Sequence, residues 1–205
     1  LSGYGLYEFN KNFYTLGRVG IGYTKSDVER DIWINENSIH LSTDYDNVLY
    51  SLYSELGYKF SINKNIKVSP YVGLMYDYVR RGSFKEDSNS IYGIETGRKN
   101  YEQFSGVAGI RTDFKFDRYK FYGGVTQVVS FSEDKLDFKA KYVGDISGNG
   151  YNITGIKLNK NTTWINLGIE AKINESTSIN ISYDISVERA KISDNMVSLG
   201  YKFRF

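Results

Sequence analysis

The sequence predicts an all-β fold: a transmembrane antiparallel up-and-down β-barrel, of which about nine strands are present. Three observations predict it. The 205 residues include 19 tyrosines, 12 phenylalanines and 20 glycines but only one proline, a composition typical of strand-rich chains. Apolar and polar residues alternate with a period of two along most of the chain. Short polar turns also alternate with long polar loops between the alternating segments.

Charge and composition exclude several classes of protein. The net charge of +2 comes from 26 basic and 24 acidic residues scattered along the chain, so we expect no nucleic-acid partner. Because cysteine is absent, a disulfide scaffold and a cysteine-based zinc site are excluded. No run of about 18 apolar residues exists, which excludes a transmembrane helix. No linker divides the chain, so residues 1–205 are expected to form one domain.

The strands are predicted from alternation. In "SINISYDISVE", Ile181 and Tyr183 share one face, whereas Ser182 and Asp184 share the other. A strand of this length is what a tilted strand needs to cross a bilayer, about 9–11 residues. The same pattern predicts nine strands, at 2–9, 13–25, 46–60, 66–80, 101–116, 119–140, 152–173, 177–188 and 195–205.

The connections between these strands alternate in length. The predicted tight turns are 10–12, 61–65, 117–118 and 174–177, and the predicted long polar loops are 26–45, 81–100 and 141–151. Outer-membrane barrels have short periplasmic turns at one end and long external loops at the other.

Alternation alone does not separate a membrane barrel from a soluble barrel or sandwich, which points its apolar face inward. Aromatic residues favour the membrane, because six phenylalanines lie beside the short turns or at the C-terminus: Phe60, Phe114, Phe116, Phe121, Phe203 and Phe205. Aromatic rings favour the headgroup level of a bilayer. We therefore expect an outer-membrane location with lipid against the apolar face, and a soluble all-β domain remains the alternative.

The last strand ends on phenylalanine, which is unusual for a chain end. The octet "SLGYKFRF" resembles the terminal assembly signal of outer-membrane barrels, with Ser198, Gly200, Tyr201, Phe203 and Phe205 in the matching positions. Before the barrel closes, this strand is an unpaired edge that another protein can extend by strand addition. The resemblance implies the barrel-assembly machinery as a partner during biogenesis.

The chain also resembles the translocator domain of autotransporters, the type V secretion proteins. In that family a Pro-aromatic-x-Gly strand precedes a Gly-x-Arg strand, as Pro70, Tyr71, Gly73, Gly109 and Arg111 do here. The resemblance implies a twelve-stranded barrel with an α-helix in its lumen, which delivers an N-terminal passenger to the cell surface. Since this sequence predicts nine strands and no preceding helix, we expect the helix and first three strands to be missing from it.

Ten charged residues fall on the polar faces, where we expect them to line the lumen and pair across it: Arg18, Glu55, Lys59, Arg111, Asp113, Glu170, Lys172, Asp184, Lys202 and Arg204. His40, the only histidine, is predicted to lie in a solvated loop. One histidine and no cysteine assemble neither a Ser-His-Asp triad nor a metal site. We therefore predict no enzymatic activity, cofactor or metal. Two alternatives stay open: an independent small barrel acting as a porin or surface adhesin, and an outer-membrane protease.

Overall fold

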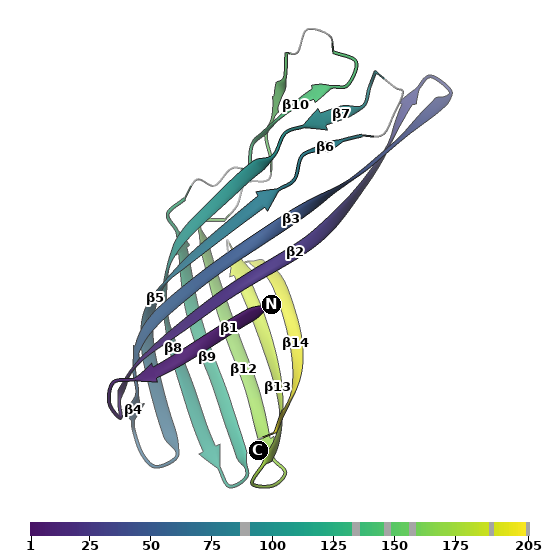
Figure 1. Ribbon diagram of the computed structural model, residues 1–205. Helices are drawn as coiled ribbons and strands as arrows, with labels where there is room; N and C mark the ends of the chain where they lie inside the picture. Colours follow the sequence, from purple (N-terminus) through teal and green to yellow (C-terminus); the bar gives the residue numbers. More distant parts are fainter. Residues whose placement is uncertain (87–90, 133–135, 146–148, 156–158, 189–190, 204–205) are drawn as a thin grey trace.

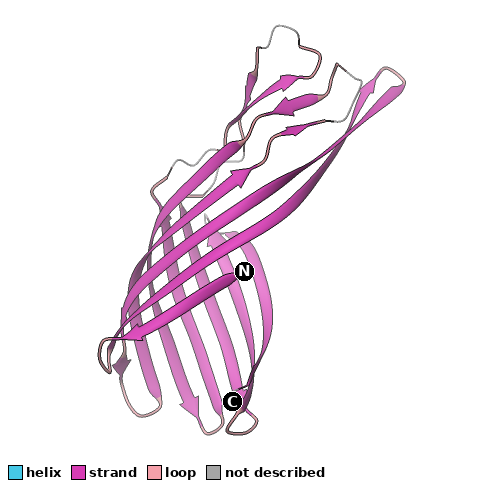
Figure 2. Cartoon of the chain, in the orientation of Figure 1, coloured by secondary structure: helices cyan, strands magenta, loops and turns pink. Residues whose placement is uncertain are grey.

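The computed structural model describes residues 1–205 except 87–90, 133–135, 146–148, 156–158, 189–190 and 204–205, and it leaves the side chains of residues 191–193 undescribed. The described residues form two antiparallel sheets (Figure 2). They contain no helix that could span a membrane.

The larger sheet is an up-and-down meander in which each strand pairs with its neighbours in sequence. Its strands are β1 (Ser2–Glu8), β2 (Phe13–Ile34), β3 (Asn37–Tyr58), β5 (Ile66–Arg81), β8 (Lys99–Phe116), β9 (Tyr119–Ser130), β12 (Asn161–Lys172), β13 (Thr177–Glu188) and β14 (Lys191–Phe203), and β4 (Phe60–Ser61) pairs with β5 just after β3 ends. The sheet curls, so that β1 to β5 lie in front of β12 to β14 in Figure 1. The predicted fold class is confirmed.

The predicted tight turns are also confirmed, and they lie together at the lower end of Figure 1. Asparagine side chains close two of them: Asn10 Oδ1 accepts hydrogen bonds from the backbone N–H groups of Asn12 and Phe13, and Asn63 does the same for Asn65 and Ile66. These Asx turns mimic a backbone turn in so short a connection. We call this the turn end of the sheet and the opposite end the loop end.

The prediction of a loop at 26–45 is wrong. Strands β2 and β3 continue through this segment as a hairpin of two 22-residue strands. The alternation continues there with shorter and more polar residues, and it places Ile32, Ile39 and Leu41 on one face. Leu41 is only 1 % exposed, so packing of an apolar side chain stabilises the hairpin. The polar composition of the segment did not indicate this packing.

The predicted strands 119–140 and 152–173 are too long, and the predicted loops 81–100 and 141–151 contain strand residues. The chain leaves the larger sheet after Ser130 and returns at Asn161. A second sheet is formed by two strands between β5 and β8, namely β6 (Phe84–Lys85) and β7 (Ile94–Thr96), and two strands between β9 and β12, namely β10 (Phe138–Tyr142) and β11 (Tyr151–Ile153). Their order in this sheet is β11-β10-β7-β6. We call it the loop-end sheet. A period-two pattern identifies strands but not the sheet they join.

An ion pair attaches the hairpin to the loop-end sheet. Arg30 donates two hydrogen bonds of 2.7 Å to the Glu86 carboxylate, which also accepts one from the Ile94 N–H at 2.6 Å. The Glu86 side chain is 4 % exposed. Burial by itself would raise the pKa of Glu86, but the hydrogen bonds from Arg30 and Ile94 outweigh it and hold the pKa below its usual value.

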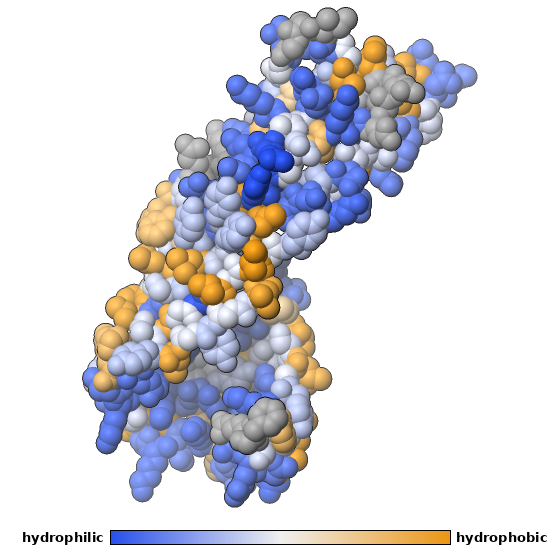
Figure 3. Space-filling model, viewed as in Figure 1, coloured by the Kyte–Doolittle hydropathy of each residue, from blue (hydrophilic) through white to orange (hydrophobic). Residues whose placement is uncertain are grey.

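The distribution of apolar side chains excludes a soluble barrel. Many aliphatic residues on the outer face are 46 to 79 % exposed, among them Val19, Ile21, Leu52, Leu56, Val72, Leu74, Ile110, Val125, Leu167, Ile181 and Leu199. The inner face instead buries polar side chains such as Glu55, Ser105 and Ser186. Figure 3 shows apolar side chains over the sheet and hydrophilic ones gathered at both ends. Apolar surface this extensive needs lipid or protein against it.

Candidate functional site

The most buried charged pair of the inner face joins Glu55 on β3 to Arg111 on β8. Arg111 donates hydrogen bonds to both carboxylate oxygens, the one from Nη2 to Oε2 being 2.8 Å long. The Glu55 side chain is 0 % exposed. Strand β5 lies between them, and it carries Gly73 directly opposite Glu55. A Cβ atom at Gly73 would overlap the Ser54 carbonyl oxygen and lie 3.1 Å from the Glu55 Cβ, so glycine permits this close approach.

Three tyrosines surround the pair. Tyr53 donates a hydrogen bond to Glu55 Oε2, and Tyr14 accepts one of 3.3 Å from Arg111 Nη1. The Arg111 guanidinium lies 3.8 Å from the centroid of the Tyr71 ring, within the range of a cation–π contact. We call Tyr14, Tyr53, Glu55, Tyr71 and Arg111 the tyrosine–arginine cluster. It joins four consecutive strands of the inner face, β2, β3, β5 and β8.

Glycines make room for tyrosine rings on neighbouring strands. A Cβ atom at Gly57 would overlap the Tyr14 ring, and one at Gly109 would overlap the Tyr71 ring. A Cβ atom at Gly168 would likewise overlap the Tyr122 ring. At these three positions, therefore, a ring from the adjacent strand occupies the space that a side chain would need.

The other predicted charged residues form separate contacts on the same face. Asp113 pairs with Lys120 at 2.9 Å, Lys59 pairs with Glu8, and the Arg18 guanidinium lies 5.5 Å from the Tyr53 ring centroid.

Asp184 accepts a 2.6 Å hydrogen bond from Asn166. The strand register places Glu170, Lys172 and Lys202 on this face too, away from the tyrosine–arginine cluster. Arg204 lies outside the described residues.

A polar cavity of about 430 Å³ lies against these side chains, lined among others by Arg111, Asp113, Lys120, Trp164, Glu170 and Asp184. Sequence reasoning missed the tyrosines and Lys120 as partners of the predicted charges. Tyr53 stands two residues before Glu55, so the alternation itself places both side chains on one face. The cavity and its charges suit a water-filled interior.

Strand β14 is an edge of the larger sheet within the described residues, pairing with β13 alone. Gly200 lies opposite Asn180, and a Cβ atom there would overlap the Asn180 amide. Ser198 lies opposite Ser182. Tyr201 is 68 % exposed and Phe203 is 52 % exposed. Phe205, the last residue of the predicted assembly signal, lies outside the described residues.

His40 lies on the far part of the β2–β3 hairpin, where its Nδ1 is 2.9 Å from Asp31 Oδ1 and both side chains are more than half exposed. The hydrogen bond with Asp31 raises the pKa of His40. Across the described ranges, no group of three or more His, Asp or Glu side chains is placed to hold a metal ion. The segment predicted to be a loop around His40 is strand, but the side chain is solvated.

A curled antiparallel meander with a polar inner face, an apolar outer face and turns and loops at opposite ends defines an outer-membrane β-barrel domain. The sequence matches the family model of the autotransporter beta-domain over residues 1–184. The chain belongs to this family, whose members are outer-membrane barrels, and the resemblance seen in its sequence is confirmed.

Solved structures similar to the chain include two autotransporter domains. The translocator domain of the autotransporter NalP from Neisseria meningitidis aligns with a TM-score of 0.75 and 14 % identity, covering 98 % of this chain and 63 % of NalP's. The chain thus spans less than two thirds of that domain. The transport unit of the autotransporter AIDA-I from Escherichia coli gives a TM-score of 0.39 and 14 % identity, covering 100 % of this chain and 87 % of its own. No curated protein matches the sequence.

Proposed function

We propose that this domain is the outer-membrane translocator of a passenger joined to its N-terminal side, which it exports and anchors at the cell surface. The observation that carries the proposal is the match to the autotransporter beta-domain over residues 1–184. The inner face supports it, because its polar cluster and the charged residues of its cavity give a wall suited to a hydrated interior that an extended polypeptide can pass.

The barrel, in this proposal, is closed by further strands between β1 and β14, to a total of about twelve. Edge strands expose backbone N–H and C=O groups that hydrocarbon cannot satisfy. The outer faces of these edges are strongly apolar, with Val197 68 % and Leu199 79 % exposed. An α-helix in the lumen would precede those strands, as the family resemblance implies.

The proposed partners follow from the two surfaces. Lipid covers the outer face, the passenger is the cargo, and the barrel-assembly machinery binds β14 by strand addition during insertion. The role needs no catalytic chemistry, and we propose none: the Glu55 and Arg111 side chains neutralise each other in the wall.

The experiment is surface display. A protease-sensitive reporter is fused to the N-terminal side of the domain in its natural context, and intact Gram-negative cells are treated with protease. We expect the reporter to be digested, and to be protected in the periplasm when β13 and β14 are deleted. A periplasmic marker that stays intact controls for lysis. Equal digestion with and without the two strands, or protection in both cases, contradicts the proposal.

Assembly through β14 is tested by crosslinking from residues 197–203 to subunits of the assembly machinery during biogenesis. Deleting Phe205 is expected to slow insertion, whereas replacing Ser38 in the hairpin is not. Absence of these crosslinks together with normal insertion of the Phe205 deletion would show that the aromatic ending is incidental.

A surface-binding role through the loop end is a second candidate. It is favoured by the loop-end sheet, which the Arg30–Glu86 pair fixes to the hairpin as an ordered surface. Replacing residues 138–153 by a short linker would abolish cell adhesion but leave passenger display intact if this role exists.

A further inference from the structure

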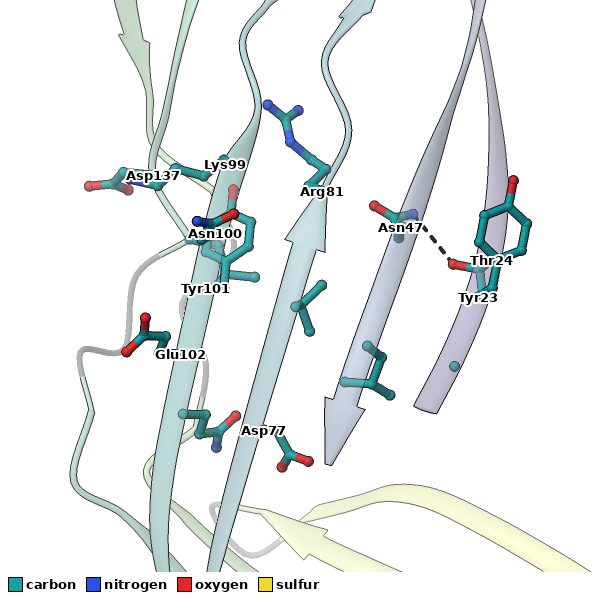
Figure 4. Close-up of a pocket in the computed structure, with 15 residues that line it drawn as sticks. Tyr23, Thr24, Asn47, Asp77, Arg81, Lys99, Asn100, Tyr101, Glu102 and Asp137 are labelled. Atoms are coloured by element: carbon teal, nitrogen blue, oxygen red, sulfur yellow. Dashed lines mark hydrogen bonds between the residues drawn. The ribbon is translucent and has the colours of Figure 1, made fainter. Parts of the chain in front are cut away.

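Two like charges face each other at the last rung between β5 and β8. Arg81 pairs directly with Lys99 in the strand register, and like charges in this position destabilise a sheet. Asp137 lines the same cavities as both residues, yet it forms no ion pair of 4.0 Å or less with either one. Figure 4 shows Arg81 on β5 and Lys99 on the neighbouring strand, with Asp137 beyond Lys99.

Arg81 is buried, with a relative exposure of 9 %. Its Nη2 donates to Thr96 Oγ1 at 2.8 Å and to the Gly97 carbonyl oxygen at 3.0 Å, and its Nε has no hydrogen-bond partner. Both acceptors are neutral. Among the residues that the structure describes, no carboxylate pairs with this guanidinium. Buried charges in proteins are normally paired, but within the described part of the chain the Arg81 charge has no counter-ion.

Aromatic rings hold the guanidinium in place. Its carbon lies 4.6 Å from the centroid of Phe138, 5.3 Å from that of Phe84 and 5.8 Å from that of Tyr45. These rings come from β10, β6 and β3, so Arg81 is the point where the two sheets meet. Cation–π contacts fix the direction of an arginine but leave its full positive charge.

A cavity of about 330 Å³ opens beside Arg81 at this junction. Among the described residues, its lining includes four cationic residues, Arg81, Arg98, Lys99 and Lys139, and one acidic residue, Asp137. Asn152, which is the strand partner of Lys139, contributes a neutral polar group. The described lining residues therefore carry an excess of three positive charges.

We propose that this cavity binds a phosphate group. A phosphate is a compact dianion whose oxygens accept hydrogen bonds from several arginine and lysine donors at once. It would offset the repulsion of the Arg81–Lys99 rung and supply the counter-ion that Arg81 lacks. The phosphate belongs either to a phosphorylated solute or to the headgroup of an outer-membrane lipid. The proposal is independent of passenger export.

The first arm of the test uses inorganic phosphate. The protein is extracted from outer membranes in mild detergent, and phosphate binding is measured by calorimetry in chloride buffer. We expect saturable one-site binding that the double variant Lys99→Gln/Lys139→Gln weakens at least tenfold. The matched control is Lys11→Gln/Lys64→Gln, which removes two lysines from the turn end and is expected to change the affinity less than twofold.

The second arm uses lipid A with and without its phosphates, detected on the protein by native mass spectrometry. Retention of the phosphorylated form alone, lost in the Lys99→Gln/Lys139→Gln variant, assigns the site to a lipid headgroup; binding of inorganic phosphate without lipid retention assigns it to a solute. Heat-modifiable gel mobility confirms that each variant is folded. The proposal is overturned if neither probe binds, or if the control variant weakens binding as much as the cavity variant does.

Discussion

Replacing Arg111 with methionine leaves the Glu55 carboxylate inside the wall without its cation. The Arg111 side chain is 45 % exposed, but the Glu55 side chain is 0 % exposed, so the carboxylate is the buried partner; Tyr53 remains as a hydrogen-bond donor to it. Breaking a buried ion pair from one side typically costs about 3–5 kcal/mol. The buried carboxylate avoids being charged without a partner by taking up a proton. Protonating a glutamate of ordinary pKa at pH 7 costs about 3.7 kcal/mol. We therefore expect the free energy of unfolding to fall by about 3–4 kcal/mol.

The assay is urea unfolding of the detergent-folded protein at pH 7 and at pH 5. Because protonation becomes easier by about 1.36 kcal/mol per pH unit, the Arg111→Met loss should shrink by about 2–3 kcal/mol at pH 5. Asp113→Asn is the control, since Asp113 and Lys120 side chains are 36 % and 35 % exposed. Partly exposed pairs of this kind are worth about 1 kcal/mol or less.

A double variant decides whether the charge is the cause. Glu55→Leu combined with Arg111→Met removes both charges, and replacement of a buried pair by apolar residues is often close to neutral. The reasoning is refuted if the single variant Arg111→Met costs less than about 1 kcal/mol at pH 7, or if the double variant costs as much as the single one.

Three further predictions follow from the faces, the edge and the loop end. Ile181→Arg should lower the free energy of unfolding by about 2–4 kcal/mol, whereas Ser182→Arg should cost much less; equal penalties in urea unfolding would reverse the assigned faces. Gly200→Leu is expected to slow membrane insertion in a pulse-chase assay, because its side chain would overlap Asn180 on β13, and a normal rate would show that β13 and β14 adjust freely. Because the pKa of Glu86 is lowered, its ionised carboxylate stabilises the docked hairpin at pH values above the ordinary glutamate pKa of about 4. This stabilisation is lost as the pH falls through the lowered pKa. The protection factors of the β7 amides, taken relative to the intrinsic exchange rate at each pH, should therefore fall in acid, and Glu86→Gln should lower them already at pH 7; unchanged protection factors in both would mean that the pair does not hold the hairpin.

Much of the larger sheet is predictable from the sequence because its rules are local. Short polar segments that contain asparagine or aspartate predicted the tight turns, and the side chains of Asn10 and Asn63 close two of these turns in the structure. The alternation in "SINISYDISVE" fixed the face of each residue of β13, which pairs in one register with β12 along its length. A slip by one residue would exchange the two faces, so the register is strongly constrained.

The loop end was predicted poorly for a physical reason. Phe138 to Tyr142 alternates as a strand of the larger sheet would, but its partners are Ile94 to Thr96 of the loop-end sheet. Nothing in the alternation distinguishes these two sheets. The upper part of the β2–β3 hairpin was not predicted because polar residues interrupt its apolar face, and the burial of Leu41 is visible only in the folded structure.

By itself the sequence determined most strands of the larger sheet, their two faces and the family, because alternation along one strand and a motif within one segment are properties of neighbouring residues. Only the tertiary structure decided which side chains meet across strands. Glu55 and Arg111 are 56 residues apart in the chain and are joined through the intervening β5. The Arg81–Lys99 rung and the rings around Arg81 likewise come from five separate strands at the junction between the two sheets. Such contacts depend on pairing, register and curl, which are set by the whole sheet and by the hydrocarbon that surrounds it.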